Sequence, residues 1–242
     1  MKQYGLIGYP LSHSFSKKYF EEKFAREHIS GCSYQLYELA AIEELPDLLT
    51  GTPNLCGLNV TIPYKQAVMP YLHSLSAEAE SIGAVNCIKI SNGKLHGHNT
   101  DWYGFATSLK SFLQQPPQQA FILGTGGSSK AVEYVLNRLG IAYLYVSRTA
   151  GSNSIAYETI AQHLQPGNLF INTTPLGMYP NVTETPAIPY HRLTTNDYLF
   201  DLIYNPTETL FLQQGKAKGA HTQNGLAMLQ LQAEKSWEIW NS

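Results

Sequence analysis

A lysine and an aspartate in the first half of the chain carry side chains suited to proton transfer. Lys65 lies one helical turn beyond a predicted strand end at Thr61, and Asp101 closes a short polar run. An ammonium group held beside a carboxylate can protonate a developing alkoxide, or take the proton back in the reverse direction. The pair therefore indicates acid–base chemistry on an alcohol or ketone, although either residue taken alone is more often a solvated surface charge.

Two serines near the N-terminus could hold a small anion. Ser14 and Ser16 are two residues apart, and in an extended segment side chains at that spacing point the same way. Both hydroxyls could then contact one carboxylate. Because a helix is predicted from residue 17, a helix N-cap is the alternative role for these serines.

A cluster of glycines lies between a predicted strand at 120–123 and a predicted helix at 128–139. Gly124 permits a tight turn, while Gly126 and Gly127 let the backbone approach a pyrophosphate closely. The N-terminus of the helix would supply N–H donors and the positive end of its dipole. The segment therefore indicates a dinucleotide site, with an ordinary glycine-rich turn as the alternative.

The end of the next predicted strand, at 142–146, bears on the choice of cofactor. An acidic side chain there would bind the ribose 2′-hydroxyl of NAD. This chain instead has Ser147, Arg148 and Thr149, with no acid among them. Arg148 can face a 2′-phosphate or stack on adenine, so NADP is favoured over NAD. A solvated surface arginine is the alternative interpretation.

No residue cluster predicts a metal site. The three cysteines, Cys32, Cys56 and Cys87, are widely spaced and form no CxxC pair, so we expect reduced thiols. His96 and His98 alternate on a predicted strand, but no third ligand is evident nearby. We assign neither a metal nor a catalytic role to any histidine.

The composition bounds the class of protein. The 242 residues allow one large or two small domains, and 16 Lys and Arg against 18 Asp and Glu leave no basic footprint for nucleic acid. No apolar run approaches the roughly 20 residues of a membrane span, and the N-terminus lacks a signal-peptide pattern. We therefore expect a cytoplasmic protein that binds neither nucleic acid nor membranes.

Short apolar runs alternate with longer helical patterns, which indicates an α/β fold around a mostly parallel sheet. Strands are predicted at 4–8, 33–38, 57–60, 84–90, 94–98, 120–123, 142–146, 169–172 and 198–202. Helices are predicted at 17–27, 42–49, 64–72, 128–139 and 225–240.

Three local patterns add detail to this outline. The run Ser91-Asn92-Gly93 predicts a hairpin turn. The polar stretch QQPPQQ between Leu113 and Ala120 predicts an interdomain linker. The last helix is expected to bury one face, made of Leu226, Leu229, Ala233, Trp237 and Trp240.

Taken together, these motifs resemble the shikimate dehydrogenase family of NADP-dependent enzymes in aromatic amino-acid and chorismate biosynthesis. The matching stretches follow one another in the same order, at 8–16, 59–65, 83–86, 97–101, 124–128, 147–149, 172–178 and 225–233. The resemblance implies a substrate domain at 1–101 and 222–242, around a Rossmann-like NADP-binding domain at 102–221.

The resemblance also implies the reaction and its residues. NADPH would reduce 3-dehydroshikimate reversibly to shikimate, with Lys65 as proton donor and acceptor and Asp101 as its partner. Ser14, Ser16 and Tyr204 would hold the substrate carboxylate, and Thr61, Asn86 and Gln232 the ring hydroxyls and the carbonyl region. The cofactor residues would be Gly124, Gly126, Gly127, Ser128, Ser147, Arg148, Thr149, Asn172, Thr173 and Met178. The partner is thus a small-molecule substrate, no metal is implied, and the oligomeric state is monomer or homodimer.

Some departures from the family pattern leave alternatives open. Members that prefer NADP commonly have Asn at the position of Ser147 and a further basic residue at the position of Ser152. In this chain Arg148 therefore remains as the clear cation for the 2′-phosphate, and use of NAD beside NADP is an open alternative. One rival is a quinate/shikimate dehydrogenase. Another is a nonenzymatic NADP-binding regulator, which should have lost Lys65 or Asp101.

Overall fold

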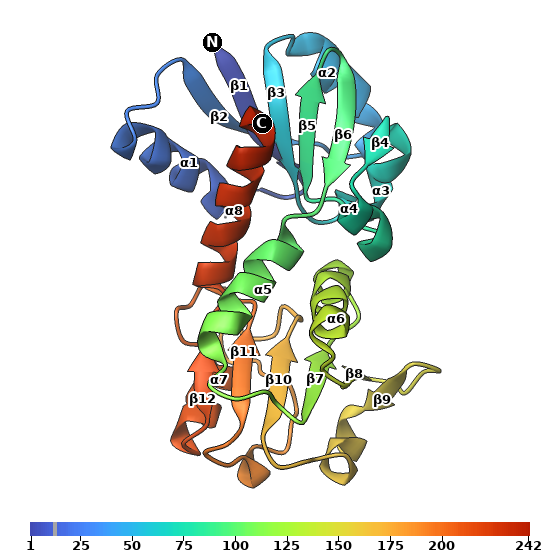
Figure 1. Cartoon of the computed structure of the whole chain (residues 1–242), viewed down its shortest axis with the longest axis vertical. Coiled ribbons are helices and arrows are strands. Elements are labelled where there is room, and N and C mark those ends of the chain that lie inside the picture. Colours follow the sequence, from blue (N-terminus) through green and yellow to red (C-terminus); the bar gives the residue numbers. More distant parts are fainter. Residues whose placement is uncertain (12–13) are drawn as a thin grey trace. The chain divides into compact units, whose positions relative to one another are not determined.

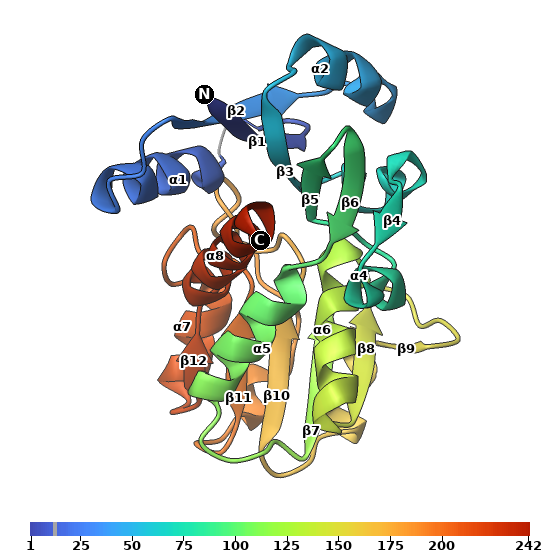
Figure 2. The same cartoon turned by 45° about the horizontal axis from the view of Figure 1, so that its top comes forward.

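The computed structural model describes residues 1–11 and 14–242, so Ser12 and His13 of the serine segment lie outside the described residues. The chain divides into two compact units, which Figures 1 and 2 show in sequence colours. The first unit is Met1–Thr100 with Ala233–Ser242, and the second is Asp101–Gln232. The division expected from the sequence placed residues 101 and 222–232 in the substrate domain, whereas here they fall in the second unit.

The first unit is built on a six-stranded sheet in the order β2-β1-β3-β5-β6-β4. Its strands are β1 (Lys2–Gly8), β2 (Cys32–Glu38), β3 (Leu55–Val60), β4 (Ser74–Leu75), β5 (Cys87–Ser91) and β6 (Lys94–His98). Its helices are α1 (Phe15–Arg26), α2 (Leu45–Gly51), α3 (Tyr64–Ala67), α4 (Ala77–Ile82) and the end of α8 (Leu226–Asn241), with short 3₁₀ turns η1 (Ile42–Glu44) and η2 (Met69–Tyr71). β1 runs parallel to β2 and β3, whereas β5 is antiparallel to both β3 and β6.

Local sequence explains several of these elements. Asn92 and Gly93 both have positive φ, at 51° and 72°, so they form the primed turn that the hairpin pattern predicted. The helix predicted at 64–72 is instead divided into α3 and η2. Pro70 lies in the first turn of η2 and lacks the N–H that a continuous helix would need.

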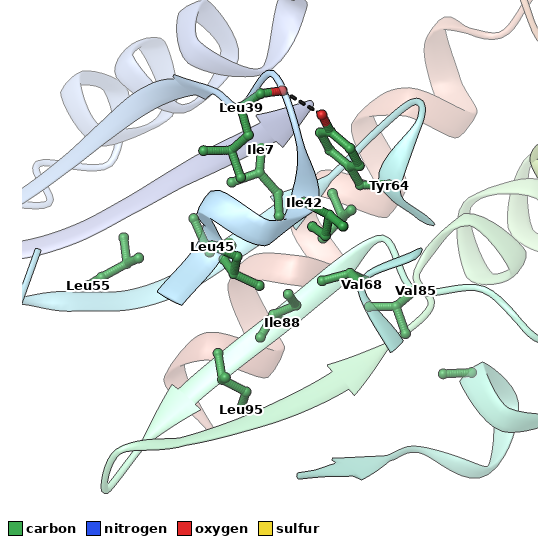
Figure 3. Packing of buried hydrophobic residues seen from close by; sticks show 13 residues of the cluster. Ile7, Leu39, Ile42, Leu45, Leu55, Tyr64, Val68, Val85, Ile88 and Leu95 are labelled. Carbon is green, nitrogen blue, oxygen red and sulfur yellow. Dashed lines mark hydrogen bonds between the residues drawn. The ribbon is translucent and has the colours of Figure 1, made fainter. Parts of the chain in front are cut away.

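Two apolar clusters cover the first sheet. Figure 3 shows one of them, to which Ile7, Leu45 and Ile88 belong. In the same cluster the Tyr64 hydroxyl donates to the Leu39 carbonyl at 2.5 Å. The other cluster is largely aromatic and holds α1 and α8 against the sheet through residues that include Tyr4, Phe20, Tyr34 and Trp240. A Cβ at Gly57 would lie 2.4 Å from the Trp240 ring, so this glycine makes room for the indole.

The second unit holds a six-stranded parallel sheet in the order β12-β11-β10-β7-β8-β9. Its strands are β7 (Gln119–Leu123), β8 (Tyr143–Ser147), β9 (Ser154–Ala156), β10 (Asn168–Asn172), β11 (Tyr198–Asp201) and β12 (His221–Gln223). Its helices are α5 (Asp101–Phe112), α6 (Gly127–Leu139), α7 (Leu210–Ala217) and the start of α8, with 3₁₀ turns η3 (Tyr157–Gln162) and η4 (Tyr190–Arg192).

Counted from β7, this strand order is that of the doubly wound Rossmann fold, which confirms the α/β class. The order reverses between β7 and β10, and ligands of such sheets bind at the carboxyl ends of the strands at that point. Alternate residues of β7 face opposite layers, with Ala120 and Ile122 in one core cluster and Phe121 and Leu123 in the other. The first layer includes α5 and α6 (Figure 1).

The predicted interdomain linker is wrong. The segment after Phe112 joins α5 to β7, and both elements belong to the second unit. The chain instead passes between the units at Thr100 and Asp101, between β6 and α5, and again within α8 at Gln232 and Ala233. Sequence reasoning missed α5 because Gly104 and Ser108 interrupt the apolar pattern on its buried face.

The last helix was predicted within a residue of its ends, but its buried face is different. Ala233, Ser236 and Trp240 are its most buried residues in the first unit, while Trp237 is half-buried. The three are spaced by three and four residues, so the helical period is correct and the polar Ser236 lies on the apolar face. None of the helices formed by residues 1–11 and 14–242 is long and apolar enough to span a membrane.

Candidate active site

The serine segment ends at the N-terminus of α1. Ser14 is the N-cap of this helix, and its hydroxyl accepts a hydrogen bond from the Ser16 backbone N–H at 3.3 Å. Both serines are half-buried. Burial raises the pKa of the Tyr34 phenol well above its usual range, and the nearby Ser16 side chain opposes part of that rise. Ser16 therefore lies in the neighbourhood of the Tyr34 hydroxyl.

Thr61 lies where β3 ends beside β1. Its backbone N–H donates to the Ile7 carbonyl at 2.9 Å, and the Tyr9 N–H donates to the Ile62 carbonyl at 3.1 Å. A Cβ added at Gly8 would approach the Thr61 methyl to 2.4 Å, so Gly8 lets the threonine pack against the end of β1. The two predicted substrate motifs are thus joined by backbone hydrogen bonds.

Lys65 and Asn86 are positioned by the segment between α4 and β5. The Val85 N–H donates to the Lys65 carbonyl at 2.7 Å, and the Val60 N–H donates to the Asn86 carbonyl at 2.9 Å. The Asn86 N–H in turn donates to the His98 carbonyl at 3.1 Å. Since Val60 and His98 end β3 and β6, these bonds place Asn86 at the carboxyl ends of both strands.

A set of buried neutral side chains surrounds Asn86, and we call it the Asn59 network. Its members are Tyr34 of β2, Asn59 of β3, Asn86, Thr100 and Ser236 of α8, and each is at most 6% exposed. Tyr34 donates to Asn59 Oδ1 at 2.8 Å, and Asn59 Nδ2 donates to Ser236 Oγ at 2.9 Å. The Ser236 and Thr100 hydroxyls lie 3.2 Å apart, and Asn86 Nδ2 donates to Thr100 Oγ1 at 3.0 Å.

In the second unit, the glycine loop follows β7 at the point where the strand order reverses. Gly124 has a φ of +102°, and a Cβ there would lie 2.8 Å from the Thr174 methyl. The Thr173 hydroxyl donates to the Leu123 carbonyl at 2.7 Å. The loops after β7 and β10 are therefore packed against each other, as the predicted cofactor residues require.

The same loop opens α6 in a way that suits a pyrophosphate. Gly126 is the N-cap, and a glycine has no side chain to occupy the first-turn N–H groups. A Cβ at Gly126 or Gly127 would meet no described atom within 4 Å. Both glycines are exposed, so their backbone is open to a ligand. This geometry fits a dinucleotide phosphate held at the helix N-terminus.

The end of β8 presents an exposed cation. Arg148 is exposed, whereas the Ser147 hydroxyl donates to the Thr149 carbonyl and lies 3.1 Å from that of Ser154. Burial raises the pKa of Tyr157 to about 12, and the nearby positive charge of Arg148 opposes the rise. Arg148 is therefore available to a phosphate at this strand end, while Ser147 closes the turn.

A second buried network organises the loop after β10, and we call it the Asp201 network. Its members are Asn172, Thr174, Asp201, Ile203 and Thr209. Asp201 Oδ1 accepts from Asn172 Nδ2 and from the Ile203 N–H, both at 3.0 Å, and Oδ2 accepts from Thr209 Oγ1 at 2.6 Å. Asn172 Oδ1 accepts from the Thr174 N–H and hydroxyl at 3.1 and 2.6 Å. The Asn172 side chain thus shapes the loop that carries Thr173 and Met178.

Asp201 is the titratable group of that network. It is fully buried, and burial raises its pKa to about 6, although the hydrogen bonds from Thr209, Ile203 and Asn172 oppose the rise. Met178 at the far end of the loop is 47% exposed, as a residue expected to line a cofactor should be.

The remaining predicted residues also belong to the second unit. Asp101 opens α5 and is 8% exposed. Tyr204 follows β11 and is half-buried, and Gln232, also half-buried, donates from Nε2 to the Leu229 carbonyl at 2.8 Å. The structure therefore groups the predicted substrate residues Ser14, Ser16, Thr61 and Asn86 with Lys65 in the first unit, and all predicted cofactor residues in the second.

Sequence reasoning missed five residues that organise these sites. Asn59 and Thr100 bond directly to Asn86, Tyr34 and Ser236 bond to Asn59, and Asp201 bonds to Asn172. A common signal was available for Asn59 and Asp201, since each is a polar residue within a short, otherwise apolar strand. Buried polar groups require partners, so such a position indicates a network even before the partners are known.

Comparison with known proteins shows similarity over the whole chain. Residues 6–88 match the family described as shikimate dehydrogenase substrate binding domain. A shikimate dehydrogenase (NADP(+)) of Clostridium beijerinckii is 43% identical over 253 residues, which cover 99% of this chain and 92% of that protein. The similarity therefore extends well beyond the segment that the family model matches.

Solved structures extend this similarity to three dimensions. A chorismate mutase/shikimate 5-dehydrogenase fusion protein from Clostridium acetobutylicum is 36% identical with a TM-score of 0.90, covering 100% of this chain and 91% of that one. Shikimate 5-dehydrogenase from Thermus thermophilus, solved with NADP(H) and shikimate, is 30% identical with a TM-score of 0.87, covering 99% and 93%.

Proposed function

The chain belongs to the shikimate dehydrogenase family, and on that premise we propose that it reduces 3-dehydroshikimate to shikimate, reversibly, with NADPH. The observation that carries the proposal is the 43% identity to an NADP-dependent relative over 99% of the chain. The open glycine loop at the switch point of the second sheet supports it from the structure. The reaction would belong to aromatic amino-acid and chorismate biosynthesis.

The second unit would hold the cofactor. The backbone of Gly124, Gly126, Gly127 and Ser128 would bind the pyrophosphate at the N-terminus of α6. Thr173 and Met178 would lie along the nicotinamide half, on the loop that Asn172 shapes from beneath. When bound, NADPH supplies the hydride that reduces the substrate ketone.

Selection of NADP would depend on the end of β8. Arg148 would pair with the 2′-phosphate, and Thr149 would lie beside it. Ser147 would act indirectly, because its hydroxyl is occupied in closing the turn. Arg148→Ala should therefore raise the KM for NADP+ by about 10-fold or more and leave that for NAD+ nearly unchanged. An equal effect on both cofactors would exclude this role.

The substrate would be held by neutral groups. Ser14, Ser16 and Tyr204 would bind the carboxylate, and Thr61, Asn86 and Gln232 the hydroxyls and the carbonyl region. A site built from hydroxyls and amides rejects an analogue that lacks a hydroxyl, because its own buried polar groups are left unpaired. Selectivity for shikimate over quinate is therefore expected to depend on these residues.

Lys65 and Asp101 would carry the proton chemistry. The Lys65 ammonium would donate a proton to the ketone oxygen as it gains negative charge, and would take it back during shikimate oxidation. The Asp101 carboxylate would keep the ammonium in place and accept a hydrogen bond from a neighbouring substrate hydroxyl. Both residues are present, so the chain has not lost the catalytic pair as a nonenzymatic regulator would.

One assay tests the proposed function. Purified protein is given shikimate or quinate, each with NADP+ or NAD+, and reduced cofactor is followed by absorbance. We expect the highest kcat/KM for shikimate with NADP+. A higher kcat/KM for quinate would favour the quinate/shikimate enzyme, and no turnover with any pair would favour a binding protein.

The role of Lys65 is tested by Lys65→Ala, with Lys94→Ala as a matched control at an exposed lysine of β6. We expect kcat of Lys65→Ala to fall by about 100-fold or more, while the dissociation constant for shikimate changes far less. The control should match the wild type. A Lys65→Ala enzyme with normal kcat and only a raised KM would contradict the proton-transfer role.

We expect the enzyme to act in the cytoplasm, where its small-molecule substrate and cofactor are dissolved, as a monomer or homodimer. Light scattering at assay concentration distinguishes the two oligomeric states.

A further inference from the structure

The Asn59 network reaches further than the residues that would touch the substrate. It begins at Tyr34, which lies near Ser16, and it ends at Asn86. Ser16 and Asn86 are both proposed substrate ligands; Ser16 lies in the first turn of α1, and Asn86 lies at the carboxyl ends of β3 and β6. Tyr34, Asn59, Ser236 and Thr100, which connect them, have no substrate role so far.

The bonds of this network determine how Asn86 is oriented. The Thr100 backbone N–H can only donate, and it donates to Asn86 Oδ1 at 2.6 Å. With Oδ1 facing this N–H, the amide nitrogen of Asn86 donates to Thr100 Oγ1 at 3.0 Å. A rotation of the amide by 180° would place two donors against each other in a buried site, which is costly.

Thr100 is held in turn by α8. Its hydroxyl is 3.2 Å from that of Ser236, and Ser236 accepts from Asn59 Nδ2 at 2.9 Å. Ser236 and Thr100 are both fully buried, so water does not replace these bonds. Thr100 also immediately precedes Asp101 in the chain, and its position limits where the backbone of Asp101 can lie.

We propose that Ser236, with Asn59 and Tyr34, is a positioning residue that fixes the Asn86 amide and the Thr100 backbone for recognition of the substrate. The assignment rests on the proposed function, because it concerns the use of Asn86 as a substrate ligand. It adds a specific role for the C-terminal helix, which contributes a hydroxyl to the substrate half of the site without touching the substrate.

The experiment compares Ser236→Ala with the wild type in shikimate oxidation. Loss of the hydroxyl leaves Thr100 and Asn59 without a shared partner, so the KM for shikimate should rise by about 10-fold. The dissociation constant for NADP+ should stay within about twofold of the wild type, since the network lies entirely in the first unit.

Ser108→Ala is the matched control. Ser108 is also a helical serine, 2% exposed, but its hydroxyl has no hydrogen-bond partner among the residues that the structure describes. Its removal should leave the KM for shikimate unchanged. This control separates the effect of removing any buried serine hydroxyl from the effect of disrupting the Asn59 network.

A double-mutant cycle tests whether Ser236 acts through Asn86. In an Asn86→Ala background, Ser236→Ala should raise the KM for shikimate by less than about twofold, because the amide that it positions is gone. If the two effects on KM multiply independently, or if Ser236→Ala alone has the KM of the wild type, the positioning role is wrong.

A second pair of variants serves if Ser236→Ala does not fold. Tyr34→Phe removes the far end of the network and should raise the KM for shikimate by about threefold. Tyr4→Phe should leave the KM for shikimate unchanged, because the Tyr4 hydroxyl is buried near Asn241 without a hydrogen bond of normal geometry to any described group. Equal KM values for the two variants would overturn the proposal.

Failure of the proposed function and failure of the positioning role give different results. If the wild type itself does not oxidise shikimate, the proposed function fails and the positioning role fails with it. If the wild type is active and the variants are unaffected, the positioning role alone is refuted.

Discussion

The Asn59 network of the first unit and the Asp201 network of the second differ in chemistry. The Asn59 network contains only amides and hydroxyls, and its amide nitrogens donate while its amide oxygens accept. The Asp201 network is centred on a carboxylate that accepts from three donors. Each network includes an asparagine near a proposed ligand. Asn86 of the Asn59 network is a proposed substrate ligand, and Asn172 of the Asp201 network shapes the loop that carries Thr173 and Met178.

The difference shows two solutions to the same problem. Neutral groups avoid the cost of burying charge, but each bond depends on the orientation of its neighbours, so the network fixes a single arrangement. A carboxylate accepts from any direction and gathers several donors at once, but it pays for desolvation and becomes sensitive to pH. The unit proposed to bind substrate uses the first solution, and the unit proposed to bind cofactor uses the second.

The largest expected effect is that of Asp201→Ala. This change leaves the side chains of Asn172 and Thr209 and the N–H of Ile203 without their acceptor in a fully buried site. We expect the free energy of unfolding to fall by about 4 kcal/mol at pH 7, measured by urea denaturation. A loss below about 1 kcal/mol would show that water or other groups replace the carboxylate.

The next largest effect is a pH dependence of stability that we expect from the Asp201 network and not from the Asn59 network. The pKa of Asp201 is about 6 in the folded protein against an ordinary 3.8, so the native state binds this proton more tightly than the unfolded state does. Stability therefore falls as the pH rises from about 4 to above 6, by about 3 kcal/mol in total for this group.

Asp201→Asn has no such titration, and it can keep acceptance from Asn172 and Ile203 through its carbonyl oxygen. Relative to the wild type it should gain about 1.4 kcal/mol between pH 5 and pH 8, measured by urea denaturation at both values. A constant difference between the two proteins would mean that Asp201 does not titrate in this range.

Asn59→Ala is the corresponding change in the neutral network. Asn59 is 6% exposed and bonds to Tyr34, Ser236 and the Asn86 carbonyl, so we expect a loss of about 2 to 3 kcal/mol in the free energy of unfolding. The same loss should be found at pH 5 and pH 8, because no member of the network titrates between them. A loss that changes with pH would remove the contrast with Asp201.

The smallest effect concerns two buried tyrosines of neighbouring strands. Tyr34→Phe should lower the free energy of unfolding by about 1 kcal/mol, because it removes the hydrogen bond to Asn59. Tyr4→Phe loses a hydroxyl that is buried and makes no hydrogen bond of normal geometry within the described chain, so it should be neutral or stabilising. Parallel urea denaturation of both variants gives the comparison, and equal losses would argue against the network.

Much of the fold could be predicted because its signals are local. Strand β7, the glycine loop and α6 follow one another within about 20 residues, and alternation, glycine and helical period each mark one of them. The hairpin at Asn92 and Gly93 was predicted for the same reason, since residues of these types accept positive φ. The break in the helix at Pro70 is equally local and could have been predicted.

The buried networks could not be predicted because their partners are distant in the chain. Asn59 and Ser236 are 177 residues apart, and Thr100 and Ser236 are 136 residues apart. Nothing in the local pattern of α8 indicates which strand its serine will meet. The prediction of an interdomain linker was also wrong because local sequence was not enough. A polar stretch with two prolines is equally typical of a loop inside one unit.

The sequence by itself therefore determined many of the elements, the α/β class and the residue types that can bind a dinucleotide or transfer a proton, because these depend on neighbours a few positions away. The tertiary structure alone decided that residues 222–232 belong to the second unit and that Asp201 and Asn59 become centres of buried networks. The reason is physical: a polar side chain is stable inside a protein only when folding brings distant donors and acceptors to it.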